Sequence, residues 1–152
     1  MFPALRIGYL VVPKSLAAAF TAAKWLCDRH TPTLEQETLA EFISTGAYER
    51  HLRRARRKNA ARRRALMEAI GERLGDRVEV TGEGSGAHVA LWPRGRCSEE
   101  TLVARAAAHG VGVSGISQYY FRQPSKPGLL LGYARLTEAQ IREGMRRLAE
   151  VL

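Results

Sequence analysis

The chain has 152 residues and a mass of 16.9 kDa, a length that fits one domain or two small lobes. Its composition, with 45% hydrophobic and 26% charged residues, excludes a collagen-like repeat, a coiled coil and wholesale disorder. No stretch approaches the ~20 apolar residues of a membrane span. The two cysteines, Cys27 and Cys97, have neither disulfide-framework nor zinc-ligand spacing, so a reduced, cytoplasmic protein is expected.

The positive charge belongs to one segment. The chain carries 24 Lys and Arg against 15 Asp and Glu, a formal net charge of +9. Nine of the basic residues lie between residues 50 and 64, where there is no acid, and outside that segment the basic and acidic residues balance. These nine are Arg50, Arg53, Arg54, Arg56, Arg57, Lys58, Arg62, Arg63 and Arg64.

The first residues are predicted to form a strand and two helices. Residues 5–12 are rich in β-branched, aliphatic and aromatic side chains, which predicts a buried strand. Ser15 is expected to cap a helix that runs to about Cys27. Thr33-Leu34-Glu35-Gln36 matches a capping box, and the helix that it opens is expected to end at Gly46.

A long helical pattern follows from Tyr48 to Leu74 and contains the basic segment. Its apolar stripe is interrupted near the middle by Asn59 and Arg62. The helix is therefore expected to be well packed at its ends and more solvated between them.

From about residue 76 the pattern predicts a β-β-α-β-β-α lobe, so the fold class is α+β. Its first helix is expected to be capped by Ser98 and to end near Gly110, and Thr137-Glu138-Ala139-Gln140 is a capping box for its second. The four predicted strands cover residues 78–81, 87–92, 111–116 and 129–134, with a glycine-rich turn at 82–86 between the first two.

No short motif predicts catalysis by itself. Gly110–Gly115 matches G-x-G-x-x-G, but a dinucleotide site needs a strand before this motif and a helix after it, and the order here is reversed. Gly110 is instead expected to be a helix C-cap. The four histidines lack metal-ligand spacing. Tyr119-Tyr120-Phe121 beside Arg122 is compatible with a stacking surface or pocket wall, although a packed corner is favoured because aromatic residues bury large areas.

The basic segment, residues 50–64, allows two interpretations. Nine cations are enough to contact a nucleic-acid backbone, and a small basic nucleic-acid-binding module remains the alternative function. The cations spread around most of the helix, however, and no aromatic residue alternates with them. A structural helix whose cations are solvated or paired with acids is therefore favoured.

Met1-Phe2-Pro3-Ala4-Leu5-Arg6-Ile7-Gly8-Tyr9 resembles the stretch just after the cofactor lysine in fold-type I pyridoxal-phosphate proteins, and most of all the aminotransferase-like domain of MocR-type transcriptional regulators. The resemblance continues through Gln36–Gly46, Tyr48–Arg54 and Arg62-Arg63, and returns at Leu129–Ala134 and in the final helix. It implies a C-terminal segment of that domain. Residues 1–47 would be a remnant of the large cofactor domain, 48–75 a long connecting helix and 76–152 a small α+β domain.

The same resemblance implies functional residues. Arg6 matches the arginine that binds the phosphate of pyridoxal 5'-phosphate, and a guanidinium suits a phosphate dianion. The cofactor lysine would lie seven residues before Arg6, which precedes Met1, so this chain alone is expected to bind the cofactor weakly or not at all and not to transaminate. Leu130 stands where amino-acid aminotransferases usually place a carboxylate-binding arginine.

The resemblance also implies partners. The expected ones are the N-terminal remainder of the cofactor domain and a second copy in a homodimer of the intact parent, with DNA bound only through an N-terminal domain outside this chain. Leu130 favours a regulator over a metabolic aminotransferase as that parent. A fragment that complements a separately encoded N-terminal half is a further possibility.

Overall fold

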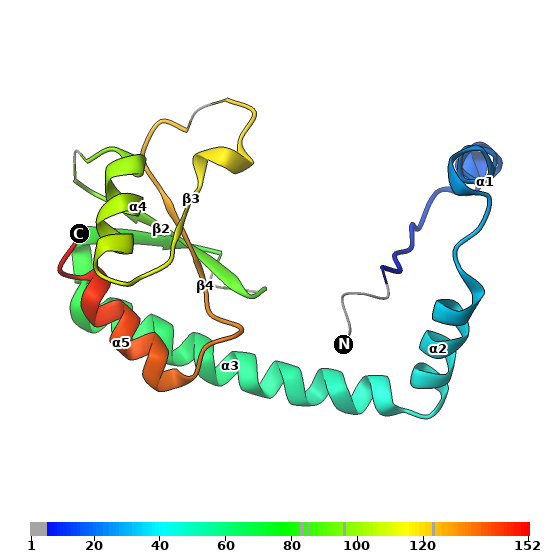
Figure 1. Ribbon diagram of the computed structural model, residues 1–152, viewed down its shortest axis with the longest axis horizontal. Helices are drawn as coiled ribbons and strands as arrows, with labels where there is room; N and C mark the ends of the chain where they lie inside the picture. Colours follow the sequence, from blue (N-terminus) through cyan, green and yellow to red (C-terminus); the bar gives the residue numbers. More distant parts are fainter. Residues whose placement is uncertain (1–5, 83, 85, 96, 123) are drawn as a thin grey trace. The chain divides into compact units, whose positions relative to one another are not determined.

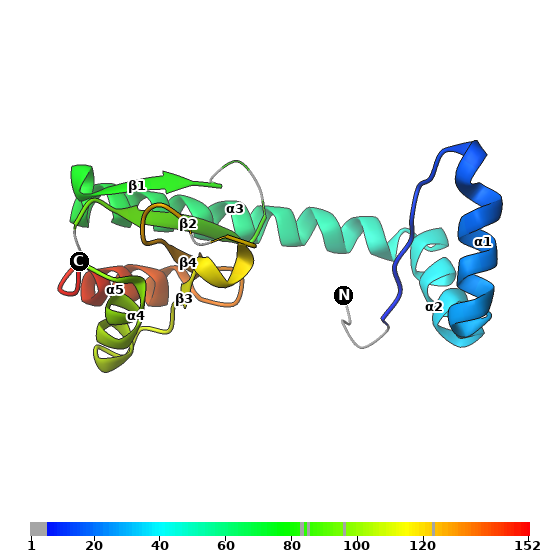
Figure 2. The ribbon, with the colours of Figure 1, turned by 90° about the horizontal axis from the view of Figure 1, so that it is seen from above.

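The computed structural model describes residues 6–82, 84, 86–95, 97–122 and 124–152, and the chain divides into two compact units, Met1–Ala55 and Arg56–Leu152. Within these ranges, none of the helices combines the length and the apolar composition that crossing a membrane requires. The helices are α1 (Lys14–Asp28), α2 (Thr33–Ser44), α3 (Ala47–Arg73), α4 (Glu99–Ala108) and α5 (Glu138–Leu148), and the strands are β1 (Val78–Thr81), β2 (His88–Pro93), β3 (Ser114–Gly115) and β4 (Leu129–Gly132) (Figure 1, Figure 2).

Helix α1 begins after a proline instead of a capping side chain. Pro13 is its N-cap residue, with φ −56°, and no side chain accepts a hydrogen bond there. Its ψ of 146° is extended, as is typical of an N-cap residue, and the helix starts at Lys14, before Ser15. The predicted cap at Ser15 is therefore wrong, because that residue lies inside the helix.

The start of α2 also differs from the prediction. Pro32 is the N-cap residue, so Thr33 lies inside the helix and the predicted capping box is wrong. The Gln36 side chain does reach back, but its Nε2 donates to the Thr31 carbonyl oxygen at 2.8 Å. The predicted end is confirmed: Gly46 has φ +68°, and its N–H donates to the carbonyl of residue 43 at 2.9 Å.

The strand predicted over residues 5–12 is not formed. Leu5 lies outside the described residues, and residues 6–12 contain neither helix nor strand. Tyr9, Leu10 and Val11 are between 77% and 89% exposed. A strand needs a neighbouring strand to take its backbone hydrogen bonds, and the described part of this unit contains no strand.

Helix α3 is a single 27-residue helix, close to the prediction. Its buried residues, Ala65, Leu66, Ala69 and Ile70, all lie in its C-terminal half. The prediction of packed ends is therefore confirmed at the C-terminal end only, since the N-terminal apolar residues are at most half-buried. Arg62 interrupts the apolar face of α3, but its Nη1 has a partner in the second unit: it donates a hydrogen bond to the main-chain carbonyl of Ala134.

The second unit contains an antiparallel sheet in the order β1-β2-β4-β3. In the register of β2 and β4, Val89 lies opposite Leu131 and Leu91 opposite Leu129. All four are buried, since alternate residues of a strand share a face. The order β-β-α-β-β-α predicted from the sequence is confirmed.

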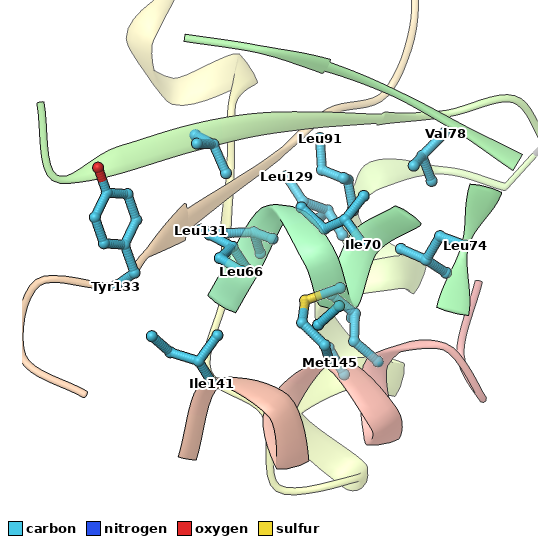
Figure 3. Packing of buried hydrophobic residues seen from close by; sticks show 14 of the residues in the cluster. Leu66, Ile70, Leu74, Val78, Leu91, Leu129, Leu131, Tyr133, Ile141 and Met145 are labelled. Atoms are coloured by element: carbon cyan, nitrogen blue, oxygen red, sulfur yellow. The ribbon is translucent and has the colours of Figure 1, made fainter. Parts of the chain in front are cut away.

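Two helices cover that face of the sheet. In Figure 3, Leu66 and Ile70 of α3 lie between the strands and the side chains of Ile141 and Met145 of α5, and all belong to one apolar core. The capping box that starts α5 is confirmed, with the N–H of residue 140 donating to the Thr137 hydroxyl at 3.2 Å.

Helix α4 lies next to β3 and keeps the ends that the sequence predicts. Its first turn is capped by the Ser98 hydroxyl, which accepts from the backbone N–H of residue 101 at 3.2 Å. Gly110 follows the helix with φ +70°, as expected of a C-cap glycine. The G-x-G-x-x-G motif therefore runs from a helix into a strand, which is the wrong order for a dinucleotide site.

The prediction of a packed aromatic corner at residues 119–121 is wrong. Tyr119, Tyr120 and Phe121 are 62%, 50% and 111% exposed. The predicted strand at 111–116 also shortens to the two residues of β3, because only Ser114 and Gly115 pair with β4.

Gly128 is predicted to be intolerant of any side chain. A Cβ there would lie 2.6 Å from Ile116 Cγ2 and 2.8 Å from the Trp92 ring. Gly128→Ala is therefore expected to lower the free energy of unfolding by about 1–3 kcal/mol through overpacking. Gly144→Ala is the control, because Gly144 lies in α5 with open space around it, and alanine there should stabilise the helix by about 1 kcal/mol. Urea unfolding followed by circular dichroism measures both, and equal effects would contradict the described packing.

Candidate functional site

Arg6 is an exposed side chain in an irregular segment of the first unit. Its φ of +50° lies in the left-handed region, which a residue with a Cβ adopts rarely and at a cost. Within the described residues, nothing accepts a hydrogen bond from its guanidinium. Toward the described residues, the five N–H donors of Arg6 are therefore unused.

Leu130 lies in the middle of β4, in the second unit. Its neighbours in the sheet register are Ala90 of β2 and Ser114 of β3. Leu130 is half-buried, whereas the residues on either side of it are buried on the core face. Its side chain therefore belongs to the opposite face of the sheet, where an aliphatic group offers no hydrogen bond to a carboxylate.

The cations of α3 are only partly paired. Arg53 forms an ion pair with Glu49 at 2.9 Å, and Arg50 Nη1 donates to the carbonyl of residue 45 at 3.2 Å. Arg62 is tied to the segment after β4, and Arg63 is not free either. Of the cations in residues 50–64, Arg53 is paired with an acid, and several of the others are solvated. The cations that are exposed and have no partner among the described residues are Arg54, Arg56, Arg57, Lys58 and Arg64.

The described part of the chain contains two free cysteines and no cluster of metal-ligating side chains. No group of three or more His, Cys, Asp or Glu side chains there could hold a metal ion. Cys27 is exposed and Cys97 is half-buried, and both are free.

A groove of about 990 Å³ opens in the second unit, beside α5. Gly110, Gly112 and Gly132 line it together with His88 and residues of α5. The α5 side is electrostatically satisfied: Arg146 and Arg147 donate hydrogen bonds to Glu143 and hold the pKa of its carboxyl at about 2. The sequence did not predict this groove, because Gly110 was interpreted as a helix C-cap and Gly112 and Gly132 fall within predicted strands.

Comparison with known proteins identifies transcriptional regulators and aminotransferases that are similar to this chain. It is 34% identical over 148 residues to the HTH-type transcriptional regulator YhdI of Bacillus subtilis, and 33% identical over 148 residues to the probable rhizopine catabolism regulatory protein MocR of Rhizobium meliloti. The crystal structure of LysN, the alpha-aminoadipate aminotransferase of Thermus thermophilus, has a TM-score of 0.86 at 29% identity and covers 99% of this chain. No protein-family model matches the chain.

The chain matches the C-terminal part of a fold-type I, aminotransferase-like domain.

This aminotransferase-like segment is short beside its relatives. Its alignments cover 97% of the chain but only 32% of YhdI and 30% of MocR, and the structural match covers 38% of LysN. The chain therefore spans about a third of the length of the curated relatives that it matches. LysN was crystallised with N-(5'-phosphopyridoxyl)-L-leucine, a derivative of pyridoxal phosphate.

Proposed function

We propose that this chain is the C-terminal segment of the aminotransferase-like domain of a MocR-type transcriptional regulator. The observation that carries the proposal is the match of nearly the whole chain to HTH-type regulators at 32% to 34% identity. The 2-aminoadipate transaminase of Thermus thermophilus is 30% identical and shares the same domain. Leu130 supports the regulator, because an aliphatic residue in β4 cannot form the paired hydrogen bonds by which arginine holds a carboxylate.

Arg6 is proposed to bind the phosphate of pyridoxal 5'-phosphate. The fit is chemical: Arg6 is exposed, has no partner among the described residues, and presents donors that match phosphate oxygens. A guanidinium carries a permanent positive charge, so it offsets part of the charge of the phosphate dianion without a proton transfer. When bound, the cofactor supplies an electron-withdrawing ring, and this chain's part is to hold its phosphate end.

The segment is proposed to be non-catalytic by itself. The sequence contains only Lys14, Lys24, Lys58 and Lys126, and none of them stands seven residues before Arg6. That position precedes Met1, and we infer that residues 1–152 taken by themselves do not hold the cofactor covalently. Tight binding of the cofactor then requires the N-terminal remainder of the domain, and a homodimer is proposed for the intact parent.

We propose the same domain boundaries that the family resemblance implies. Residues 1–47 belong to the cofactor domain, 48–75 form the connecting helix, and 76–152 form the small domain.

A substitution at Arg6 tests the phosphate assignment. The chain is fused behind the part of YhdI that precedes the aligned region, so that the whole domain is present. Arg6→Gln is expected to weaken pyridoxal-phosphate binding in this fusion about 10- to 100-fold, the value of hydrogen bonds to a charged group. The affinity of Arg6→Lys for pyridoxal phosphate should lie between those of the parent fusion and Arg6→Gln, because lysine keeps the charge but loses the planar set of paired donors. Fluorescence titration measures the affinity.

The control is Arg29→Gln, which removes another exposed arginine of the same unit. Its affinity for pyridoxal phosphate should equal that of the parent fusion. If Arg6→Gln behaves like Arg29→Gln, Arg6 does not bind the phosphate.

The unfused chain tests the absence of catalysis. After incubation with pyridoxal phosphate and reduction with borohydride, mass spectrometry should find no stoichiometric adduct at a single lysine. A stoichiometric adduct at one site together with transamination of an amino acid would refute the proposal.

A further inference from the structure

The basic segment of α3 is only partly explained by its role as a connector. Arg57 and Arg64 are seven residues apart, which places them on the same side of the helix about 10 Å apart along its axis. Arg57 precedes Leu66 by nine residues, or half a rotation, so it points away from the core that Leu66 enters. Arg56 and Lys58 flank Arg57, and all four cations are exposed.

These cations lack the acid partners that the arginines of α5 have. In α5, Arg146 pairs with Glu143 and Glu150, and Arg147 pairs with Glu143, at 2.7 to 2.9 Å. In α3, no acid lies between residues 50 and 67. Lys58 instead has Arg62 four residues further on, a like-charge spacing that destabilises an isolated helix.

Positive charge without acid partners is therefore concentrated on this part of α3, whereas three arginines of α5, Arg142, Arg146 and Arg147, are paired with glutamates. Repulsive charge clusters without structural compensation are expected at functional surfaces. The ligand that removes such repulsion is a polyanion with regularly spaced charges.

We propose that Arg56, Arg57, Lys58 and Arg64 of α3 form a contact surface for the phosphate backbone of duplex DNA. The choice of duplex DNA rests on the proposed function, because a DNA-binding regulator brings this helix and DNA into one complex. Contacts to phosphate alone give weak, sequence-independent binding, with Kd of about 10⁻⁴ to 10⁻⁶ M at physiological salt. A weak second contact adds substantially to the affinity when another domain already holds the same DNA.

The test measures how binding by the full 152-residue chain depends on salt. A fluorescent duplex of mixed sequence and about 20 base pairs is titrated by anisotropy between about 50 and 200 mM salt. The double variant Arg57→Gln/Arg64→Gln is expected to lower the slope of log K against log salt by about 0.9 for each lost contact. The affinity should fall about eightfold for each contact at 0.1 M salt.

The matched control is Arg142→Gln/Arg146→Gln, which removes the same charge from two arginines that are paired with acids. It should change the affinity less than twofold, and urea unfolding confirms that both variants fold. Equal losses in the two variants would show that net charge alone attracts DNA and would overturn the proposal. Absence of DNA binding by the parent chain at about 50 mM salt would overturn it as well.

A third arm separates DNA from a membrane. Vesicles that contain phosphatidylglycerol should bind the parent chain and the Arg57→Gln/Arg64→Gln variant equally. If that variant loses vesicle binding and keeps DNA binding, the surface is a lipid contact and the proposal fails. The phosphate test at Arg6 is unaffected by either result, since Arg6 is intact in all these variants.

Discussion

Leu129→Ala is expected to lower the free energy of unfolding of the second unit by about 2–5 kcal/mol. Leu129 is fully buried and lies in β4, between Leu91 of β2 and Gly115 of β3. Its side chain faces the layer made by α3 and α5 (Figure 3). Truncation leaves a cavity, because the sheet and the two helices cannot move together to fill it. The lost stability therefore includes a cavity term as well as the lost apolar burial.

The control is the adjacent leucine. Leu130→Ala removes the same atoms from a half-buried side chain on the other face of the sheet and should cost about 1 kcal/mol. Urea unfolding followed by circular dichroism compares the two variants with the parent. If both substitutions cost the same, Leu129 and Leu130 do not face different environments and the described register is wrong.

This contrast between neighbours is more than a run of three leucines can predict. The sequence predicted a strand over 129–134, and β4 indeed covers Leu129–Gly132. Which leucine faces the core depends on the pairing of β4 with β2 and β3 and on where α3 lies. Those are non-local contacts, whereas the composition of a strand is local.

The same distinction explains the failures in the first unit. Capping side chains are local signals, and Ser98 and Thr137 were predicted correctly. At α1 the sequence predicted a cap at Ser15, but the helix starts at Lys14 after Pro13, so the local capping signal was misplaced. The strand predicted at residues 5–12 depends on a partner strand that the described part of this unit does not contain.

Some site chemistry was also beyond local reasoning. The sequence placed Arg6 and Leu130 only through a family resemblance, since neither stands in a motif with intrinsic chemistry. Exposure of Tyr119, Tyr120 and Phe121 contradicts the packed corner, because large aromatic area favours burial only where a neighbouring surface exists to cover it.

Glu99 shows how a local interpretation captures only half of a residue's role. Glu99 lies in the first turn of α4, where its negative charge interacts favourably with the helix dipole. In the structure its carboxylate also accepts hydrogen bonds from the backbone N–H of Ser117, at 3.2 Å, and of Gly128, at 3.2 Å. The Ser117 hydroxyl donates to it as well. One side chain therefore holds both ends of the segment that carries the exposed aromatic residues.

Glu99→Ala is accordingly expected to lower the free energy of unfolding by about 2–4 kcal/mol at pH 7, because partly buried donors lose a charged acceptor. Glu100→Ala is the matched control. Glu100 lies in the same turn and is exposed, so its loss removes only the helix-dipole effect, at a cost of about 0.3–1 kcal/mol. Equal costs for the two variants would mean that the hydrogen bonds to Ser117 and Gly128 contribute nothing.

The pH dependence of this difference identifies its cause. Partial burial raises the pKa of the Glu99 carboxyl, but the hydrogen bonds from the Ser117 side chain and from the backbone outweigh it and hold the pKa below the ordinary value of 4.5. A carboxyl whose pKa is lowered by folding stabilises the protein fully above its unfolded-state pKa, and this stabilisation is lost as the pH falls through the folded-state value. The gap between the parent chain and Glu99→Ala should therefore be constant from neutral pH down to about 5 and then narrow in acid. A gap that stays unchanged in acid would show that packing, and not the ionised carboxylate, makes Glu99 important.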